Sequence, residues 1–163
     1  MFHADYRFIW RLLRRLGVRE DQVDDATQQV FLIAAERMDD IQINRERSFA
    51  FGTALRLAQS LHRRAKRETI SDTCDETASG LPSPDDLTEQ RRNTELLGRV
   101  LDRMPLDLRT VFILYELETL SSPEIAELIE IPLGTVASRL RRARAQWKSL
   151  LELEISTRRG TRS

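Results

Sequence analysis

Residues 120–148 constrain the fold more than any other stretch, because they read as two short helices joined by a tight turn. Ser121 followed by Glu124 is a capping box, in which each side chain satisfies a backbone N–H of the other residue at the start of a helix. Pro123 lies in the same first turn, where a missing N–H costs nothing. The segment 131–134, Ile-Pro-Leu-Gly, then breaks the apolar pattern. This arrangement predicts a helix-turn-helix.

The second helix of the pair has an apolar back and a basic front, which suits entry into the major groove of DNA. The apolar residues fall at three- and four-residue steps: Val136, Leu140, Ala143 and Trp147. A basic helix is often only a solvated surface. This one, however, follows a capped helix and a Pro-x-Gly turn, and that combination favours DNA binding. We expect Ser138, Arg141 and Arg142 to contact base edges. We expect phosphate contacts from Arg139 and Arg144, with Thr135 near the helix start.

Charge is segregated along the chain although the total balances, with 26 Lys and Arg against 26 Asp and Glu in 163 residues. Residues 63–67 and 139–148 are basic, and residues 68–89 are acidic with no Lys or Arg. Two local contacts with a polyanion are therefore expected, rather than general stickiness. The single cysteine, Cys74, allows no internal disulfide and suits a reducing cytoplasm. The amino terminus does not read as a signal peptide, and no apolar run reaches the length of a membrane span.

Apolar residues recur at helical spacing along most of the chain, and no segment alternates like a strand. The predicted fold is all-α, with two small helical bundles joined by a flexible acidic linker and the helix-turn-helix in the second bundle. The expected parts are an N-terminal domain at 1–67, a linker at 68–86, a C-terminal domain at 87–155 and a tail at 156–163. The linker is rich in Ser, Thr, Asp and Pro, so it lacks the apolar surface needed to offset ordering entropy.

The first bundle is expected to hold three helices, the first ending at Gly17 as a C-cap. The second begins at Asp21 or Asp24, and the third covers residues 49–67. Their expected apolar faces are Phe8, Ile9, Leu12, Leu13 and Leu16 in the first; Ala26, Val30, Phe31, Ile33 and Ala34 in the second; and Phe51, Ala54, Leu55, Ala58 and Leu61 in the third.

Several motifs together resemble the extracytoplasmic-function (ECF) group of bacterial RNA polymerase sigma factors. In the second half these are Leu-Asp-Arg-Met-Pro at 101–105, Leu-Ser-Ser-Pro-Glu-Ile-Ala at 120–126 and Gly-Thr-Val-Ala-Ser-Arg-Leu-Arg-Arg-Ala-Arg at 134–144. In the first half, residues 24–38 are similar to the family's Glu-Asp-x-x-Gln-x-x-Phe helix, and residues 47–67 resemble its promoter-melting helix. The resemblance covers nearly the whole chain in the family's order.

The resemblance implies a protein that binds core RNA polymerase, opens the minus-10 element of promoter DNA with its first domain and reads the minus-35 element with its second. The resemblance assigns the contact with polymerase to Asp24, Asp25, Gln28 and Phe31, which would bind a coiled coil of the largest subunit. An acid, an amide and an aromatic on one side of a helix suit a partner surface with charged and apolar parts, although Phe31 alone also reads as a core residue. An anti-sigma protein is a further expected partner.

The minus-10 surface is expected on the third helix, at Phe49, Arg56, Ser60, Arg63, Arg64, Lys66 and Arg67. The four cations at its end form a phosphate site that contributes affinity more than sequence choice. Phe49, Phe51 and His62 are candidates for stacking on unpaired bases, against the alternative that the phenylalanines are core. The chain departs from the family here, with Phe49 for Trp, Arg56 for Asn and Ser60 for Asp. We therefore expect weaker base discrimination at the minus-10 element. Ala137, where Lys or Arg is usual, removes one groove contact.

Two other classes of function remain open. A stand-alone helix-turn-helix regulator would bind duplex DNA without polymerase, but it has no need of the Asp25, Gln28 and Phe31 helix. An enzyme is disfavoured, because His3 and His62 are far apart in sequence and no Gly-rich phosphate loop occurs. No metal or other cofactor is expected.

Overall fold

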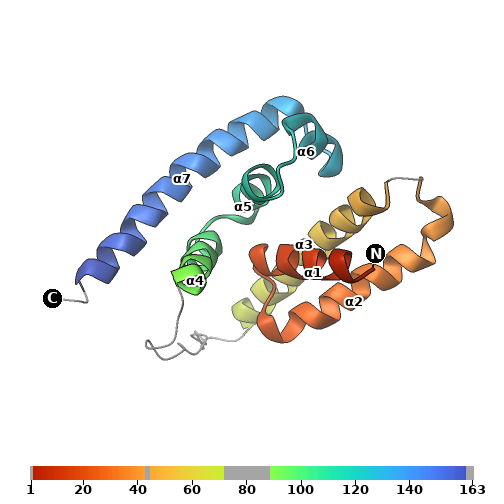
Figure 1. The fold of residues 1–163 in the computed structure, drawn as a ribbon, viewed down its shortest axis with the longest axis horizontal. Helices are drawn as coiled ribbons and strands as arrows, with labels where there is room; N and C mark the ends of the chain where they lie inside the picture. Colours follow the sequence, from red (N-terminus) through yellow and green to blue (C-terminus); the bar gives the residue numbers. More distant parts are fainter. Residues whose placement is uncertain (1, 43–44, 72–88, 161–163) are drawn as a thin grey trace.

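A computed structural model describes residues 2–42, 45–71 and 89–160, and every regular element in these ranges is helical, as the sequence predicts (Figure 1). The elements are α1 (Phe2–Arg15), α2 (Glu20–Glu36), the 3₁₀ turn η1 (Met38–Asp40), α3 (Glu46–Ser71), α4 (Glu89–Asp102), α5 (Leu106–Phe112), the π-helical turn η2 (Ile113–Leu117), α6 (Ser122–Leu128) and α7 (Leu133–Gly160). Helices α1–α3 form one bundle and α4–α7 the other.

The first bundle is built around α1, whose expected apolar stripe is buried. Gly17 ends this helix with φ of 90°, a left-handed conformation that glycine adopts without strain. The N–H of Val18 then reaches back to the carbonyl of Leu13 at 3.0 Å, so the expected C-cap is confirmed. From α3, Phe51 packs edge-on against Phe8 with ring centroids 4.5 Å apart. This packing fixes α3, and with it the basic residues on its outer side.

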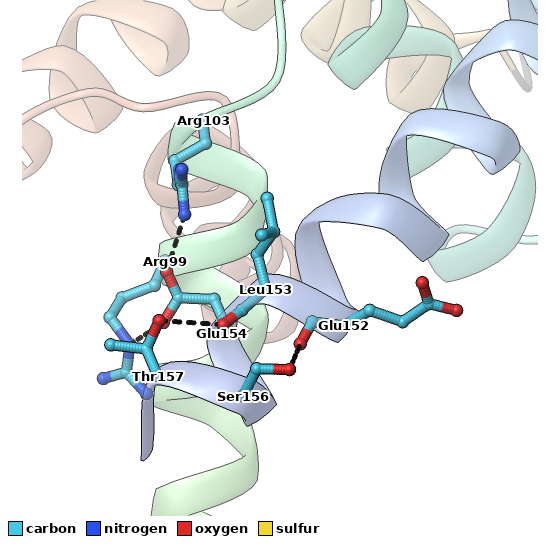
Figure 2. Close-up of polar contacts among 7 residues, drawn as sticks. All are labelled: Arg99, Arg103, Glu152, Leu153, Glu154, Ser156 and Thr157. Carbon is cyan, nitrogen blue, oxygen red and sulfur yellow. Dashed lines mark hydrogen bonds and ion pairs between the residues drawn. The ribbon is translucent and has the colours of Figure 1, made fainter. Parts of the chain in front are cut away.

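The second bundle surrounds Val100, Leu101, Val111, Ile113 and Leu114, all fully buried. The helix expected at 108–117 is α5 continued by the π-turn η2. Helix α7 begins in the helix-turn-helix and is long enough for its C-terminal part to contact α4. Figure 2 shows Arg99 of α4 and Arg103, just after α4, pointing toward one carboxylate of α7, that of Glu154. The N···O distances are 3.4 and 3.1 Å.

Two expected boundaries fall inside helices. Helix α3 continues through Ser71 into the segment predicted as linker, and α7 continues through Gly160 past the predicted domain end at residue 155. Local helix propensity explains both extensions. Neither the stretch from Glu68 nor residues 156–160 contains a Pro or an early Gly that would end the helix. The rest of the linker, including Cys74, lies outside the described residues.

The two bundles lie side by side (Figure 1), and their buried apolar residues form one continuous cluster. Helix α1 contacts α4, and α3 contacts α6. The two halves are therefore packed together rather than separated, and the surfaces predicted to bind DNA lie near the contact between them.

Candidate nucleic-acid and partner interface

The helix-turn-helix consists of α6 and α7, and α6 begins with the predicted capping box. Glu124 Oε2 accepts hydrogen bonds from the N–H and the hydroxyl of Ser121, both at 2.7 Å, and the Glu124 N–H points back to Ser121 Oγ at 3.4 Å. The hydrogen bonds from Ser121 lower the pKa of Glu124, because they stabilise the ionised carboxylate. The start of α6 is thereby fixed.

The turn between α6 and α7 differs in detail from the predicted Pro-x-Gly turn. Its left-handed residue is Glu130, with φ of 55°, and the N–H of Ile131 closes the turn on the carbonyl of Ala126 at 3.1 Å. Gly134 already lies in the first turn of α7. The carbonyl of Pro132 accepts from the N–H of Thr135 at 2.9 Å, so Pro132 and Thr135 shape the start of the recognition helix.

The apolar back of α7 is confirmed. Val136, Leu140 and Ala143 are buried, and Trp147 stacks on Phe112 with ring centroids 4.8 Å apart. This packing turns the opposite side of the helix, with Arg141 and Arg142, toward solvent.

The recognition-helix cations fall into two groups. Arg139 is partly covered and pairs with Asp107 at 3.8 Å. Arg144 donates from Nε to Glu116 Oε1 at 2.6 Å and lies over the ring of Tyr115. Arg141 and Arg142 are exposed and make no ion pair within the described residues. The two arginines predicted to contact bases are therefore unpaired there, whereas both predicted phosphate contacts have internal carboxylate partners. Ser138 is half-buried and donates to the carbonyl of Thr135 at 3.1 Å.

The predicted minus-10 residues share α3. Phe49, Arg56, Ser60, Arg63 and Arg67 recur at helical steps along one side of it. Arg56 and the four terminal cations, Arg63, Arg64, Lys66 and Arg67, are exposed, whereas Phe49 and Ser60 are half-buried. This stripe can hold a phosphate backbone with a partly exposed aromatic ring at its start.

Of the candidates for base stacking, Phe51 is a core residue and His62 has a hydrogen-bond partner. Phe51 is 5% exposed and packs in the core against Phe8. His62 donates from Nε2 to the carbonyl of Leu16 at 2.8 Å, which ties α3 to the end of α1. Phe49 and His62 are both half-buried, whereas the apolar period of α3 places Phe51 inward.

On α2 three of the four predicted residues are exposed, and only Phe31 is turned partly inward. Asp25 and Gln28 are exposed, but Phe31 is half-buried and stacks on Tyr6 at 5.9 Å. Asp24 is exposed and accepts a hydrogen bond from the indole N–H of Trp10 at 2.9 Å. The sequence reasoning missed Leu32, which is 63% exposed on this face. A large apolar side chain outside the predicted core set was the feature that could have identified it.

A crevice of about 440 Å³ separates the two candidate DNA surfaces. Gln59, His62, Arg63 and Lys66 of α3 line one wall, and the other is lined by α5, by Ile129 and Ile131 at the turn, and by Arg139 of α7. No group of His, Cys, Asp and Glu in the described ranges could hold a metal ion. None of the helices described is long and apolar enough to cross a membrane.

Comparison with known proteins identifies two family regions in the same order. Residues 1–68 match the family model for sigma-70 region 2, and residues 94–146 match that for sigma-70 region 4. The interval between the two matches, residues 69–93, contains all of the predicted linker except residue 68. The second match contains α6 and the first half of α7, to residue 146.

Curated relatives match along nearly the full chain. The ECF RNA polymerase sigma factor SigE of Mycolicibacterium smegmatis is 28% identical over 91% of this chain, which spans 58% of that relative's length. The RNA polymerase sigma factor NccH of Alcaligenes xylosoxydans xylosoxydans is 30% identical to this chain. The match covers 90% of this chain and 82% of the length of NccH.

A solved structure has the same fold. The sigma factor RpoE of Bartonella quintana, in complex with the anti-sigma factor NepR, superposes with a TM-score of 0.71 at 20% identity. The match covers 93% of this chain and 96% of that one.

Proposed function

The chain belongs to the sigma-70 family, in its ECF group, and from this membership we propose that it binds core RNA polymerase and directs it to promoter DNA. It is a transcription initiation factor, and the proposal assigns it no catalytic residue. Its place of action is the cytoplasm, where the polymerase works.

The polymerase-binding surface is the exposed face of α2. Asp25 and Gln28 supply charged and hydrogen-bonding groups, and Leu32 supplies an apolar anchor. Interfaces of this kind commonly depend on a few apolar or aromatic side chains surrounded by polar ones. Asp24 and Phe31 support this face through Trp10 and Tyr6. The partner is a coiled coil of the largest polymerase subunit.

The minus-35 element is read by α7. Arg141 and Arg142 reach the base edges, because an arginine can donate two hydrogen bonds to guanine O6 and N7. Ser138 and Thr135 lie at the same end of the helix, and Arg139 and Arg144 approach phosphates by exchanging their carboxylate partners for the DNA backbone.

The minus-10 element is engaged by the α3 stripe. Its cations attach to the backbone, and Phe49 is the ring available for an unpaired base. Because Arg56 and Ser60 replace a polar amide and an acid of the family, the surface is more positive, and base discrimination is weaker.

One observation carries the proposal: a helix-turn-helix with unpaired arginines and a separate exposed face on α2 occur in one chain. Transcription from a promoter-containing template by core polymerase, with and without this protein, tests it. A sigma factor gives specific transcripts only when both are present. A stand-alone regulator would bind duplex DNA but would neither associate with core polymerase nor start transcription.

An anti-sigma protein is a further partner under this proposal, because RpoE of Bartonella quintana, which shares the fold, is held by one.

A further inference from the structure

The recognition helix begins with an exposed apolar side chain. Leu133 is the first residue of α7 and is 52% exposed, whereas Ile129 and Ile131, just before it, pack partly buried against the core. A single exposed leucine is ordinary on a protein surface. What this one can do therefore depends on where it lies and on what surrounds it.

The first turn of α7 holds Leu133 in a defined position. The carbonyl of Pro132 accepts from the N–H groups of Thr135 and Val136 at 2.9 and 3.1 Å, and the Val136 side chain is fully buried. Leu133 is therefore part of an anchored helical turn. This turn lies beside α6, at the opposite end of α7 from its contact with α4 (Figure 1).

Leu133 starts a row of exposed side chains that ends at a predicted base contact. Leu133, Ala137 and Arg141 recur at four-residue steps, so they lie one above the other along α7, and all three are exposed. A side chain built at Gly134 would meet nothing else in the described residues within 4 Å, beyond its own neighbours in the helix. The small residues Gly134 and Ala137 thus leave Leu133 open to close approach from outside.

The chemistry of this row fits one feature of the major groove. In a helix-turn-helix, the N-terminal residues of the recognition helix contact base edges. Among the four bases only thymine presents a methyl group there, and apolar side chains recognise it by contact. Where the ECF group often has Lys or Arg, Ala137 supplies apolar surface beside Leu133. The substitution thus exchanges a charged group for a place where a methyl group can be buried.

We propose that Leu133 and Ala137 form an apolar contact for the C5-methyl group of one thymine in the minus-35 element, next to the base read by Arg141. This inference rests on the proposed reading of that element by α7. Loss of the methyl group should weaken binding roughly fourfold, the usual effect of one buried methylene-sized group.

Uracil tests the contact, because it lacks the methyl group of thymine but keeps its O4 acceptor and its base pairing. Minus-35 duplexes are first selected from a randomised pool with the full chain, alone and with core polymerase. Each thymine of the enriched block, on either strand, is then replaced by uracil in turn, and affinity is measured at fixed salt. We expect one of these replacements to weaken binding by the wild-type chain roughly fourfold.

Variants assign the effect to Leu133. Leu133→Ala should bind the thymine and uracil duplexes equally, whereas Leu133→Met keeps an apolar side chain and should keep the preference. Ala137→Lys should reduce the preference, because a long charged side chain covers the apolar surface. Leu153→Ala is the matched control, since Leu153 is 53% exposed at the other end of α7, and it should behave as wild type. Circular dichroism checks that each variant is folded.

Three results would overturn the inference: an enriched block without thymine, uracil duplexes bound as tightly as thymine duplexes, or a methyl preference that survives Leu133→Ala. Transcription with core polymerase separates this failure from failure of the proposed function. A chain that directs specific transcription without a methyl preference loses this inference alone. A chain that shows the preference on duplexes selected without polymerase, but neither binds polymerase nor starts transcription, loses the sigma-factor assignment instead.

Discussion

Arg144 and Glu116 form a short hydrogen-bonded ion pair, with Nε and Oε1 2.6 Å apart, beside the ring of Tyr115. The hydrogen bond from this arginine to Glu116 raises the pKa of Arg144, so the group stays a cation at every ordinary pH. A DNA phosphate must therefore compete with a carboxylate for this arginine. Salt and sequence effects at the recognition helix depend on that competition.

Replacing Glu116 with Gln should release Arg144 for phosphate. Affinity should rise for all sequences alike, and the salt dependence should steepen by about one unit of slope, because each neutralised phosphate contributes roughly 0.9. Glu130→Gln is the matched control, because it removes the same charge at an exposed carboxylate in the turn. Titrations at several salt concentrations that gave equal slopes for both variants would contradict the account. Adding Arg144→Ala to Glu116→Gln should cancel the gain.

Arg142→Ala should relax specificity at one base pair of the minus-35 element. A bidentate arginine contact discriminates between bases by about 1–3 kcal/mol. The difference in binding free energy between the preferred site and a site altered at that base pair should therefore shrink by that amount. Binding to a panel of single-base variants measures the effect. Arg92→Ala, which removes an exposed cation from α4, should leave the preference unchanged. Equal loss on every variant of the site would assign Arg142 to phosphate instead.

Leu32→Asp should weaken binding to core polymerase by tenfold or more, since loss of a central apolar anchor costs about 2 kcal/mol. Its side chain is 63% exposed, so thermal stability should hardly change. Leu153→Asp is the matched control, because Leu153 is 53% exposed on α7. Co-elution with core polymerase measures the result. Unaltered binding by Leu32→Asp would remove this face of α2 from the interface.

Glu124→Gln should remove a pH-dependent part of the stability. The pKa of Glu124 is lowered in the folded protein, so its stabilising effect is full above the ordinary carboxyl pKa and is lost as pH falls through the lowered value. The stability difference between wild type and variant should therefore be larger at neutral pH than in acid. Denaturant unfolding at a series of pH values measures it, and a difference that does not vary with pH would be inconsistent with the capping geometry.

Features set by neighbours in sequence were predictable. The capping box depends on residues three apart, and the Gly17 terminus and the apolar back of α7 follow from local period and backbone freedom. Helix type and order, and the all-α class, follow from the same local information.

Features set by distant residues were not predictable. The pair Arg15–Glu118 joins positions far apart in sequence, and no local pattern couples them. The internal partner of Arg144 lies 28 residues away. On α2, apolar residues occupy most of the circumference, so the sequence did not decide that Phe31 turns inward and Leu32 outward. These three-dimensional choices determine which site residues are free to act.

Selection from a randomised promoter library, with core polymerase and this protein, tests the central claim most directly. The account predicts two enriched blocks at a fixed spacing, with the minus-35 block more stringent than the minus-10 block and relaxed at one position by Arg142→Ala. Absence of transcripts, or enrichment of a single block independent of polymerase, would contradict it.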